Sequence, residues 1–124
     1  MYIIDDDPSA LRGLQRLMTA HGYETRAFAS ARGLLASSLP DSYSCLLIDV
    51  AMPEMDGPQL YAELLRRGCQ APAIFITAMD DPAVRESVER TGAAAFLRKP
   101  VDADELLDAI KRALTGPGKR TMEK

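Results

Sequence analysis

The sequence has few of the residues that mark several large classes of protein. Only two of its 124 residues are cysteines, Cys45 and Cys69, and they have neither the spacing of zinc ligands nor the pattern of a disulfide framework. The single histidine, His21, precedes a glycine at an expected helix end, and no nucleophile or metal-ligand partner is evident for it. We therefore expect reduced, structural cysteines and a structural histidine.

Long apolar segments and an excess of positive charge are also missing. No stretch is long and apolar enough to span a bilayer or to act as a signal peptide. We therefore expect a soluble, cytoplasmic chain without membrane contacts. The formal net charge of −3 gives no general attraction to polyanions, which predicts that this chain does not bind nucleic acid directly.

What the sequence does contain is a regular alternation of short apolar runs and amphipathic stretches. With 47% hydrophobic and 27% charged residues, the 124-residue chain has the size and composition of one globular domain. Because the apolar runs mostly lack polar alternation, they are typical of strands in a sheet that is covered on both faces. We expect five such strands, at residues 2–4, 25–28, 45–49, 73–77 and 94–97.

Helix signals fill the intervals between these strands. Pro8 and Pro82 each follow an aspartate, which predicts a capped helix start, and Asp102 with Glu105 has the spacing of a capping box. Two further helices are predicted at residues 30–37 and 58–67. Strict alternation with short connections predicts an α/β fold, a doubly wound parallel sheet with right-handed crossovers.

Polar residues at the ends of the strands are the candidates for a site, because ligands of such sheets bind at the carboxyl ends of the strands. Carboxylates brought together there repel one another unless a hard cation joins them, and Mg²⁺ prefers oxygen ligands of this kind. A lysine and a hydroxyl nearby supply a positive charge and a hydrogen-bond donor for phosphoryl oxygens. The strand ends carry this whole set of groups, in Asp5, Asp6, Asp49, Thr77 and Lys99.

Asp49 is the candidate for the residue that takes the phosphoryl group. It stands alone at its strand end, whereas Asp5 and Asp6 are adjacent. A carboxylate held beside the metal, rather than one of a metal-binding pair, is the better candidate for a nucleophile. Asp7 precedes Pro8 and is expected only to cap a helix.

Four motifs in order, IIDDDPS, LLIDVAMPEMDG, IFITA and AFLRKP, resemble those of the response-regulator receiver domain of two-component signalling. Each motif alone is weak, but the ordered set is specific and covers roughly residues 2–115. The resemblance implies a flavodoxin-like (βα)5 fold with strand order 2-1-3-4-5, with the receiver at residues 1–115. A linker is predicted at 116–124, because Gly116, Pro117 and Gly118 break the last helix and charged residues follow. It also implies a signalling phosphoacceptor rather than an enzyme, with only self-phosphorylation and autodephosphorylation expected.

The resemblance further implies how the acidic residues act. Asp49 would be phosphorylated and would bind Mg²⁺ (or Mn²⁺) together with Asp6 and the backbone carbonyl of Ala51. Asp5 would be a metal-site residue that acts mainly through water.

Roles for the remaining site residues follow from the same resemblance. Thr77 and Lys99 would hold phosphoryl oxygens, the Lys99–Pro100 peptide bond would be cis, and Phe96 would be the switch aromatic. Taken singly, each is better explained without a function: Thr77 as a buried strand residue, Lys99 as a solvated charge and Phe96 as a core residue. Their joint placement favours the functional interpretation.

Partners and output are also implied by the family. The phosphodonor would be a sensor histidine kinase, a phosphotransfer protein or a small phosphodonor. Phosphorylation would draw Thr77 inward and leave space into which Phe96 can turn. The surface of the fourth helix, fifth strand and fifth helix would then repack and favour a homodimer or a different contact with an output domain. The segments AFASA and GAAAFLRKPV resemble FixJ-type regulators, whose output is commonly a LuxR-type DNA-binding domain, in this case outside the chain. Apolar Ala51 and Met79 offer few handles to an attacking water, which predicts a long-lived phosphorylated state.

Two other hypotheses stay open on the sequence alone. A stand-alone receiver would shuttle phosphate in a phosphorelay or dock on a protein, and the length of the natural reading frame would distinguish it from a transcription factor. A Mg²⁺-dependent phosphohydrolase of the haloacid-dehalogenase type also uses an aspartate nucleophile. That family needs a D-x-D-x-T/V motif after the first strand, and DDDPS lacks the threonine or valine.

Overall fold

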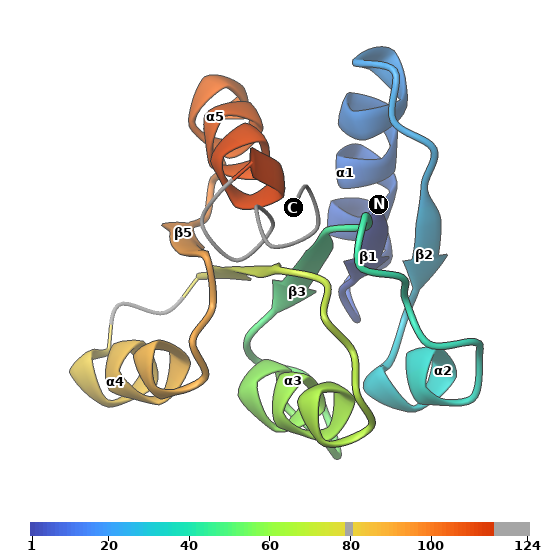
Figure 1. Cartoon of the computed structure of the whole chain (residues 1–124). Helices are drawn as coiled ribbons and strands as arrows, with labels where there is room; N and C mark the ends of the chain where they lie inside the picture. The colour runs from blue at the N-terminus through green and yellow to red at the C-terminus, as the bar shows by residue number, and fades with distance from the viewer. Residues whose placement is uncertain (79–80, 116–124) are drawn as a thin grey trace.

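Strands and helices alternate along the chain in the computed structural model, which describes residues 1–78 and 81–115 (Figure 1). The strands are β1 (Tyr2–Ile4), β2 (Arg26–Phe28), β3 (Leu46–Asp49), β4 (Ala73–Thr77) and β5 (Ala95–Arg98). The helices are α1 (Pro8–Ala20), α2 (Ala31–Leu35), α3 (Gly57–Arg66), α4 (Pro82–Arg90) and α5 (Ala103–Thr115). Neighbouring strands pair in parallel in the order β2-β1-β3-β4-β5, which confirms the predicted fold class and strand order.

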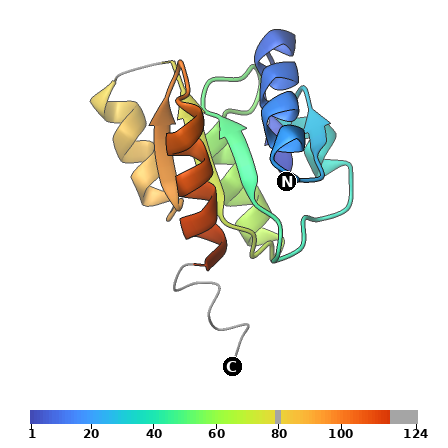
Figure 2. The same ribbon diagram turned by 90° about the horizontal axis from the view of Figure 1, so that it is seen from above.

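Helices cover both faces of the sheet. In Figure 1, α1 and α5 lie above the strands and α2, α3 and α4 below them, and Figure 2 shows the same two layers from above. Alternate residues of each strand point into opposite layers, so that Leu47 and Ile74 pack towards α1 and α5 while Ile48 and Phe75 pack towards the other three helices. Burial on both sides explains why the strands lack polar alternation.

The starts of the helices follow the capping signals in the sequence. Asp7 accepts a hydrogen bond from the backbone N–H of Ser9 at 3.0 Å, and Asp81 accepts one from Ala83 at 2.9 Å. The Glu105 backbone N–H donates to Asp102 at 2.9 Å in the same way. The acidic residues before the two prolines therefore begin helices, as the sequence predicted.

Two helices differ from their predicted bounds. Helix α2 is shorter than residues 30–37, because Ser30 caps it by accepting from the Gly33 N–H at 3.1 Å and the Ser37 hydroxyl turns back to the Leu34 carbonyl at 2.7 Å. Helix α3 begins one residue earlier than predicted, at Gly57, after Asp56. Its cap is a full capping box closed by Gln59.

Some predictions concern segments outside the described residues. Met79 and the expected linker at 116–124 both lie there. Within the described part, no helix has the length and apolar character needed to cross a membrane. Cys45 and Cys69 form no disulfide among the described residues and both are buried, although Cys69 lies in a polar stretch of sequence.

Candidate functional site

Three carboxylates meet at the carboxyl edge of the sheet. Asp5 and Asp6 follow β1 and Asp49 ends β3, and these two strands are neighbours with Ile4 opposite Ile48. One carboxylate oxygen from each aspartate lies within 4.8 Å of the others. Asp5 and Asp49 are buried, at 1% and 8% exposure, whereas Asp6 is exposed. The cluster is therefore open to solvent on the side of Asp6.

Lys99 brings a positive charge to this cluster from the end of β5. Its ammonium group lies 3.1 Å from Oδ2 of Asp5 and 3.5 Å from Oδ1 of Asp49. Its backbone N–H donates to the carbonyl of Thr77 at 2.8 Å, and the peptide bond to Pro100 is cis. One lysine is thus shared between two buried carboxylates, which leaves the cluster with a surplus of negative charge.

The ionisation of the cluster reflects that surplus. Burial, and after it the charge of Asp5, raise the pKa of Asp49 to about 6, although the charge and the hydrogen bond of Lys99 lower it. Burial alone would lower the pKa of Lys99, but its hydrogen bond to Asp5 and the two carboxylate charges raise that pKa above its usual value. Asp49 is therefore an ionised carboxylate above neutral pH that lacks full compensation from the protein.

The donor set fits a hard divalent cation. Carboxylate oxygens are the ligands that Mg²⁺ and Mn²⁺ prefer, and Mg²⁺ keeps several of its waters, for which the exposed side at Asp6 leaves room. The surplus negative charge beside Asp49 is of the kind that such a cation neutralises. Ala51, whose carbonyl would bind the metal according to the family resemblance, is exposed and lies in the loop after β3.

Thr77 and Phe96 lie on one face of the sheet beside this cluster. Thr77 ends β4 and is fully buried. Phe96 stands opposite Phe75 in the pairing of β4 with β5, and Phe75 and Thr77 are two residues apart, so the side chains of Thr77 and Phe96 project from the same face. Phe96 is half-buried and packs against the cluster of core residues around Phe75.

Gly57 is a site residue that the sequence did not reveal. A Cβ at this position would lie 2.7 Å from the backbone oxygen of Asp49 and 3.0 Å from the ring of Phe75. Its N–H donates to the carbonyl of Val50 at 2.8 Å, so the start of α3 is packed directly against the backbone that carries Asp49. The capping-box spacing of Asp56 and Gln59 could have placed the helix start at Gly57, but the close approach has no sequence signal.

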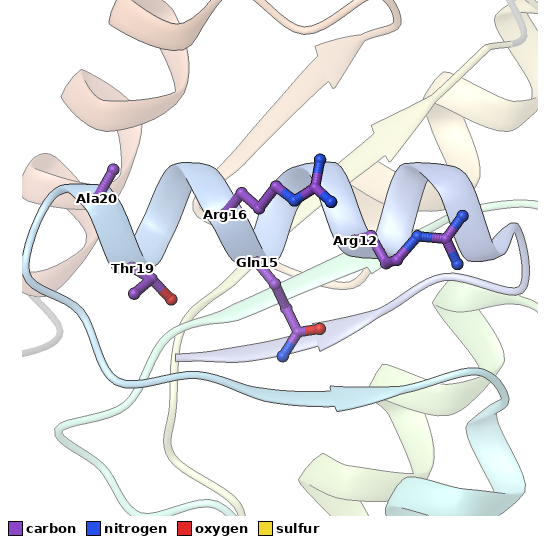
Figure 3. Close-up of a pocket in the computed structure, with 5 residues that line it drawn as sticks. All are labelled: Arg12, Gln15, Arg16, Thr19 and Ala20. Carbon is purple, nitrogen blue, oxygen red and sulfur yellow. The ribbon is translucent and has the colours of Figure 1, made fainter.

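A separate hollow of about 480 Å³ lies along the outer side of α1 (Figure 3). It is basic, with two guanidinium groups and no carboxylate among its lining residues, which are Arg12, Gln15, Arg16, Thr19 and Ala20. Its lining offers no metal ligand of the kind that gathers at the strand ends. The acidic cluster is thus the better candidate for a chemical site.

Comparison with known proteins places the same features in a family. A model of the response regulator receiver domain matches residues 1–111. Nodulation protein W of Bradyrhizobium diazoefficiens is 39% identical over 120 residues, which are 97% of this chain and 53% of that protein. The chain therefore spans about half the length of this curated relative.

Two solved structures show the same fold. The response regulator StyR superposes with a TM-score of 0.87 at 34% identity, over 98% of this chain and 62% of that one. The structure of FixJ-N superposes with a TM-score of 0.85 at 28% identity, over 92% of this chain and 91% of that one. Likeness to FixJ-N supports the FixJ-type resemblance only loosely, because StyR is as similar in fold and closer in sequence. Taken with the acidic cluster and the strand order, the match over nearly the whole described chain shows that this protein belongs to the response-regulator receiver family.

Proposed function

We propose that this chain accepts a phosphoryl group on Asp49 from the phosphohistidine of a sensor histidine kinase or phosphotransfer protein, or from a small phosphodonor. The observation that carries the proposal is the sharing of Lys99 between buried Asp5 and Asp49, with Asp6 within reach. Such a site has a nucleophile in Asp49 and a fixed cation in Lys99, and its excess negative charge can bind a metal ion. The proposed exchange takes place in the cytoplasm.

The chemistry is an in-line displacement at phosphorus. A carboxylate oxygen of Asp49 forms the new P–O bond while the donor's bond to phosphorus breaks. In a phosphohistidine this is the P–N bond and the imidazole leaves, and in acetyl phosphate it is a P–O bond and acetate leaves. With its pKa raised to about 6, Asp49 is ionised and ready to attack at pH 7 and above. Lys99 stays protonated and stabilises the phosphoryl oxygens by charge, and Thr77 donates a hydrogen bond to one of them.

Mg²⁺ (or Mn²⁺), held by Asp6, Asp49 and the carbonyl of Ala51 and through water by Asp5, would supply positive charge to the transferring group. The raised pKa of Asp49 supports this assignment, because it reflects a buried negative charge that the protein does not fully compensate. The family match favours this phosphoacceptor role over a haloacid-dehalogenase type of phosphohydrolase.

The decisive experiment is incubation with Mg²⁺ and acetyl phosphate followed by intact-mass measurement. We expect one phosphoryl adduct on the wild type and none on Asp49→Asn, which keeps the shape of the side chain but removes its nucleophilic charge. Asp7→Asn is the matched control, because Asp7 only caps α1 and asparagine caps equally well, so its adduct should equal that of the wild type. No adduct on the wild type, or an equal one on Asp49→Asn, contradicts the proposal.

Phosphorylation would then act on the surface of α4, β5 and α5. We propose that residues 1–115 form the receiver, that 116–124 link it to an output, and that the altered α4-β5-α5 surface favours a homodimer. A LuxR or FixJ-type DNA-binding domain is the output we propose, and a relative about twice as long as this chain supports a further domain. Light scattering with and without phosphoryl adduct tests the dimer, and an unchanged mass contradicts it.

A long lifetime of the adduct is the last part of the proposal. Ala51 is apolar and lies in the exposed loop beside Asp49, where it cannot position an attacking water. We expect the adduct to persist on the isolated chain and Ala51→Asn to shorten its life, as measured by loss of phosphoryl mass with time. Rapid loss from the wild type contradicts this part alone.

A further inference from the structure

A basic side chain of α4 lies over the ring of Phe96. The guanidinium carbon of Arg85 is 5.4 Å from the centroid of that ring, within the range of a cation–π contact. Helix α4 lies in the lower layer in Figure 1, and Figure 2 shows it next to β5. Arg85 itself is exposed, whereas Phe96 is half-buried against core residues that include Phe75 and Val88. The ring is therefore held between the core and a surface charge.

The position of this ring is linked to the site through Thr77. Strands β4 and β5 pair Phe75 with Phe96 and Thr77 with Arg98, so Thr77 and Phe96 are diagonal neighbours on one face of the sheet. Thr77 is fully buried, and interiors are packed closely enough that a shift of one side chain alters the room left to the next. A phosphoryl group that draws Thr77 towards the acidic cluster thereby changes the space beside Phe96.

We propose that Arg85 is a positioning residue that holds Phe96 in its present rotamer and opposes its rotation when the site takes a phosphoryl group. This rests on the proposed function, because it needs phosphorylation of Asp49, and on the role of switch aromatic that the family resemblance implies for Phe96. A cation–π contact depends on the ring face, so any other rotamer of Phe96 loses it. A contact made in one arrangement and lost in the other shifts the equilibrium between them.

The size and sign of the change in phosphoryl-mimic binding distinguish this positioning role from a long-range effect of the positive charge of Arg85. An exposed cation–π contact alters an equilibrium by about two- to five-fold. Loss of Arg85 should therefore tighten the binding of a phosphoryl mimic by about that factor. A field effect has the opposite sign, because removal of a positive charge weakens the binding of an anion.

Calorimetric titration with Mg²⁺ and beryllofluoride, which mimics the phosphoryl group, tests the proposal on four proteins. We expect Arg85→Gln to bind about two- to five-fold more tightly than the wild type and Arg85→Lys to lie between them. The matched control is Arg90→Gln, which removes one charge from the same helix at a residue that pairs with Glu86 at 3.5 Å. Affinity of Arg85→Gln that equals or falls below that of Arg90→Gln overturns the proposal.

A spectroscopic readout follows the ring itself. The chain has three phenylalanines, so labelling with 4-fluorophenylalanine gives three ¹⁹F signals. Arg85→Gln should shift the signal of Phe96 towards its position in the beryllofluoride complex, whereas the signal of Phe28, which is stacked on Tyr2, should not move. A Phe96 signal that does not move in Arg85→Gln overturns the proposal.

The same measurements distinguish failure of this inference from failure of the function. A wild-type protein that binds no beryllofluoride and takes no phosphoryl group overturns the proposed function and this inference with it. A wild-type protein that binds, with Arg85→Gln unchanged, overturns only the role of Arg85.

Discussion

Two groups of ion pairs in this molecule have opposite composition. At the carboxyl edge of the sheet, one cation, Lys99, is shared by two buried carboxylates, Asp5 and Asp49. On the outer side of α3, one carboxylate, Glu63, is shared by two arginines whose side chains are 71% and 43% exposed. The first group has a surplus of negative charge in a protected place, and the second has a surplus of positive charge in water.

The two carboxylates respond in opposite ways. Burial and the neighbouring Asp5 raise the pKa of Asp49 to about 6, whereas hydrogen bonds from Arg66 and Arg67 lower the pKa of Glu63 to about 2. The protein fully satisfies the ionised form of Glu63 but not that of Asp49. A buried carboxylate whose charge the protein does not compensate, such as Asp49, indicates a site that binds an external group. A compensated carboxylate at the surface, such as Glu63, indicates an ion pair that stabilises its helix.

The largest expected effect on stability comes from Gly57, which packs against the backbone of Asp49. Gly57→Ala would place a Cβ 2.7 Å from the backbone oxygen of Asp49, which cannot rotate away, so we expect a loss of about 2–3 kcal/mol in the free energy of unfolding. Gly13→Ala is the matched control, because nothing lies within 4 Å of its new Cβ inside α1, and a gain of about 0.5–1 kcal/mol is expected. Urea unfolding measures both, and a Gly57→Ala protein as stable as the wild type contradicts the packing.

The metal affinity tests whether the negative surplus has the proposed use. Asp6→Asn removes one charge from the three-carboxylate cluster, and we expect Mg²⁺ binding to weaken on the order of ten- to hundred-fold. Asp7→Asn changes the neighbouring charge but leaves the cluster intact, so its affinity should stay within about twofold of the wild type. Calorimetry measures both, and equal weakening in the two variants would show only a general acidic attraction.

How far the sequence predicted these features depends on the range of the interaction. The strands and the helix starts at Pro8 and Pro82 were predictable, because apolar runs and capping residues are local signals. The order of the strands in the sheet was predicted only by the family resemblance. The meeting of the acidic residues followed from the rule that strand ends gather at one edge. The approach of Gly57 to Asp49 was not predictable, since it depends on how α3 packs in three dimensions.

The placement of Arg85 shows the same limit at the surface. Its place in the sequence gives no sign of a partner, and only the packing of α4 against β5 brings it above Phe96. The end of α2 was also missed, because the bond between Ser37 and the Leu34 carbonyl competes with a further helical turn. Most strands and helix starts were therefore predictable from the sequence, while the end of α2 and the contacts between elements required the three-dimensional structure.

The stability of the metal-free protein tests the raised pKa of Asp49. Its folded pKa of about 6 exceeds the ordinary value of 3.8, so the folded state binds the proton more tightly and loses stability as the pH rises from about 4 through 6. In a chelator at pH 7.5, Asp49→Asn should therefore unfold with about 1–2 kcal/mol more free energy than the wild type. This gap should shrink as the pH falls towards 4, and a gap that grows on acidification contradicts burial and the charge of Asp5 as the cause.

The smallest expected effect is that of changing Glu63, which pairs with Arg66 and Arg67 on the surface of α3. Because the pKa of Glu63 lies below its ordinary value of 4.5, at about 2, its contribution to stability is present above pH 4.5 and is lost as the pH falls towards 2. The pairs it makes with exposed arginines are screened by salt, so Glu63→Gln should alter unfolding at pH 7 little, and less still at high salt. Its Mg²⁺ affinity and its phosphoryl adduct should equal those of the wild type. If either one falls in Glu63→Gln, the two groups are coupled, and the separation of a chemical site from a structural ion pair is wrong.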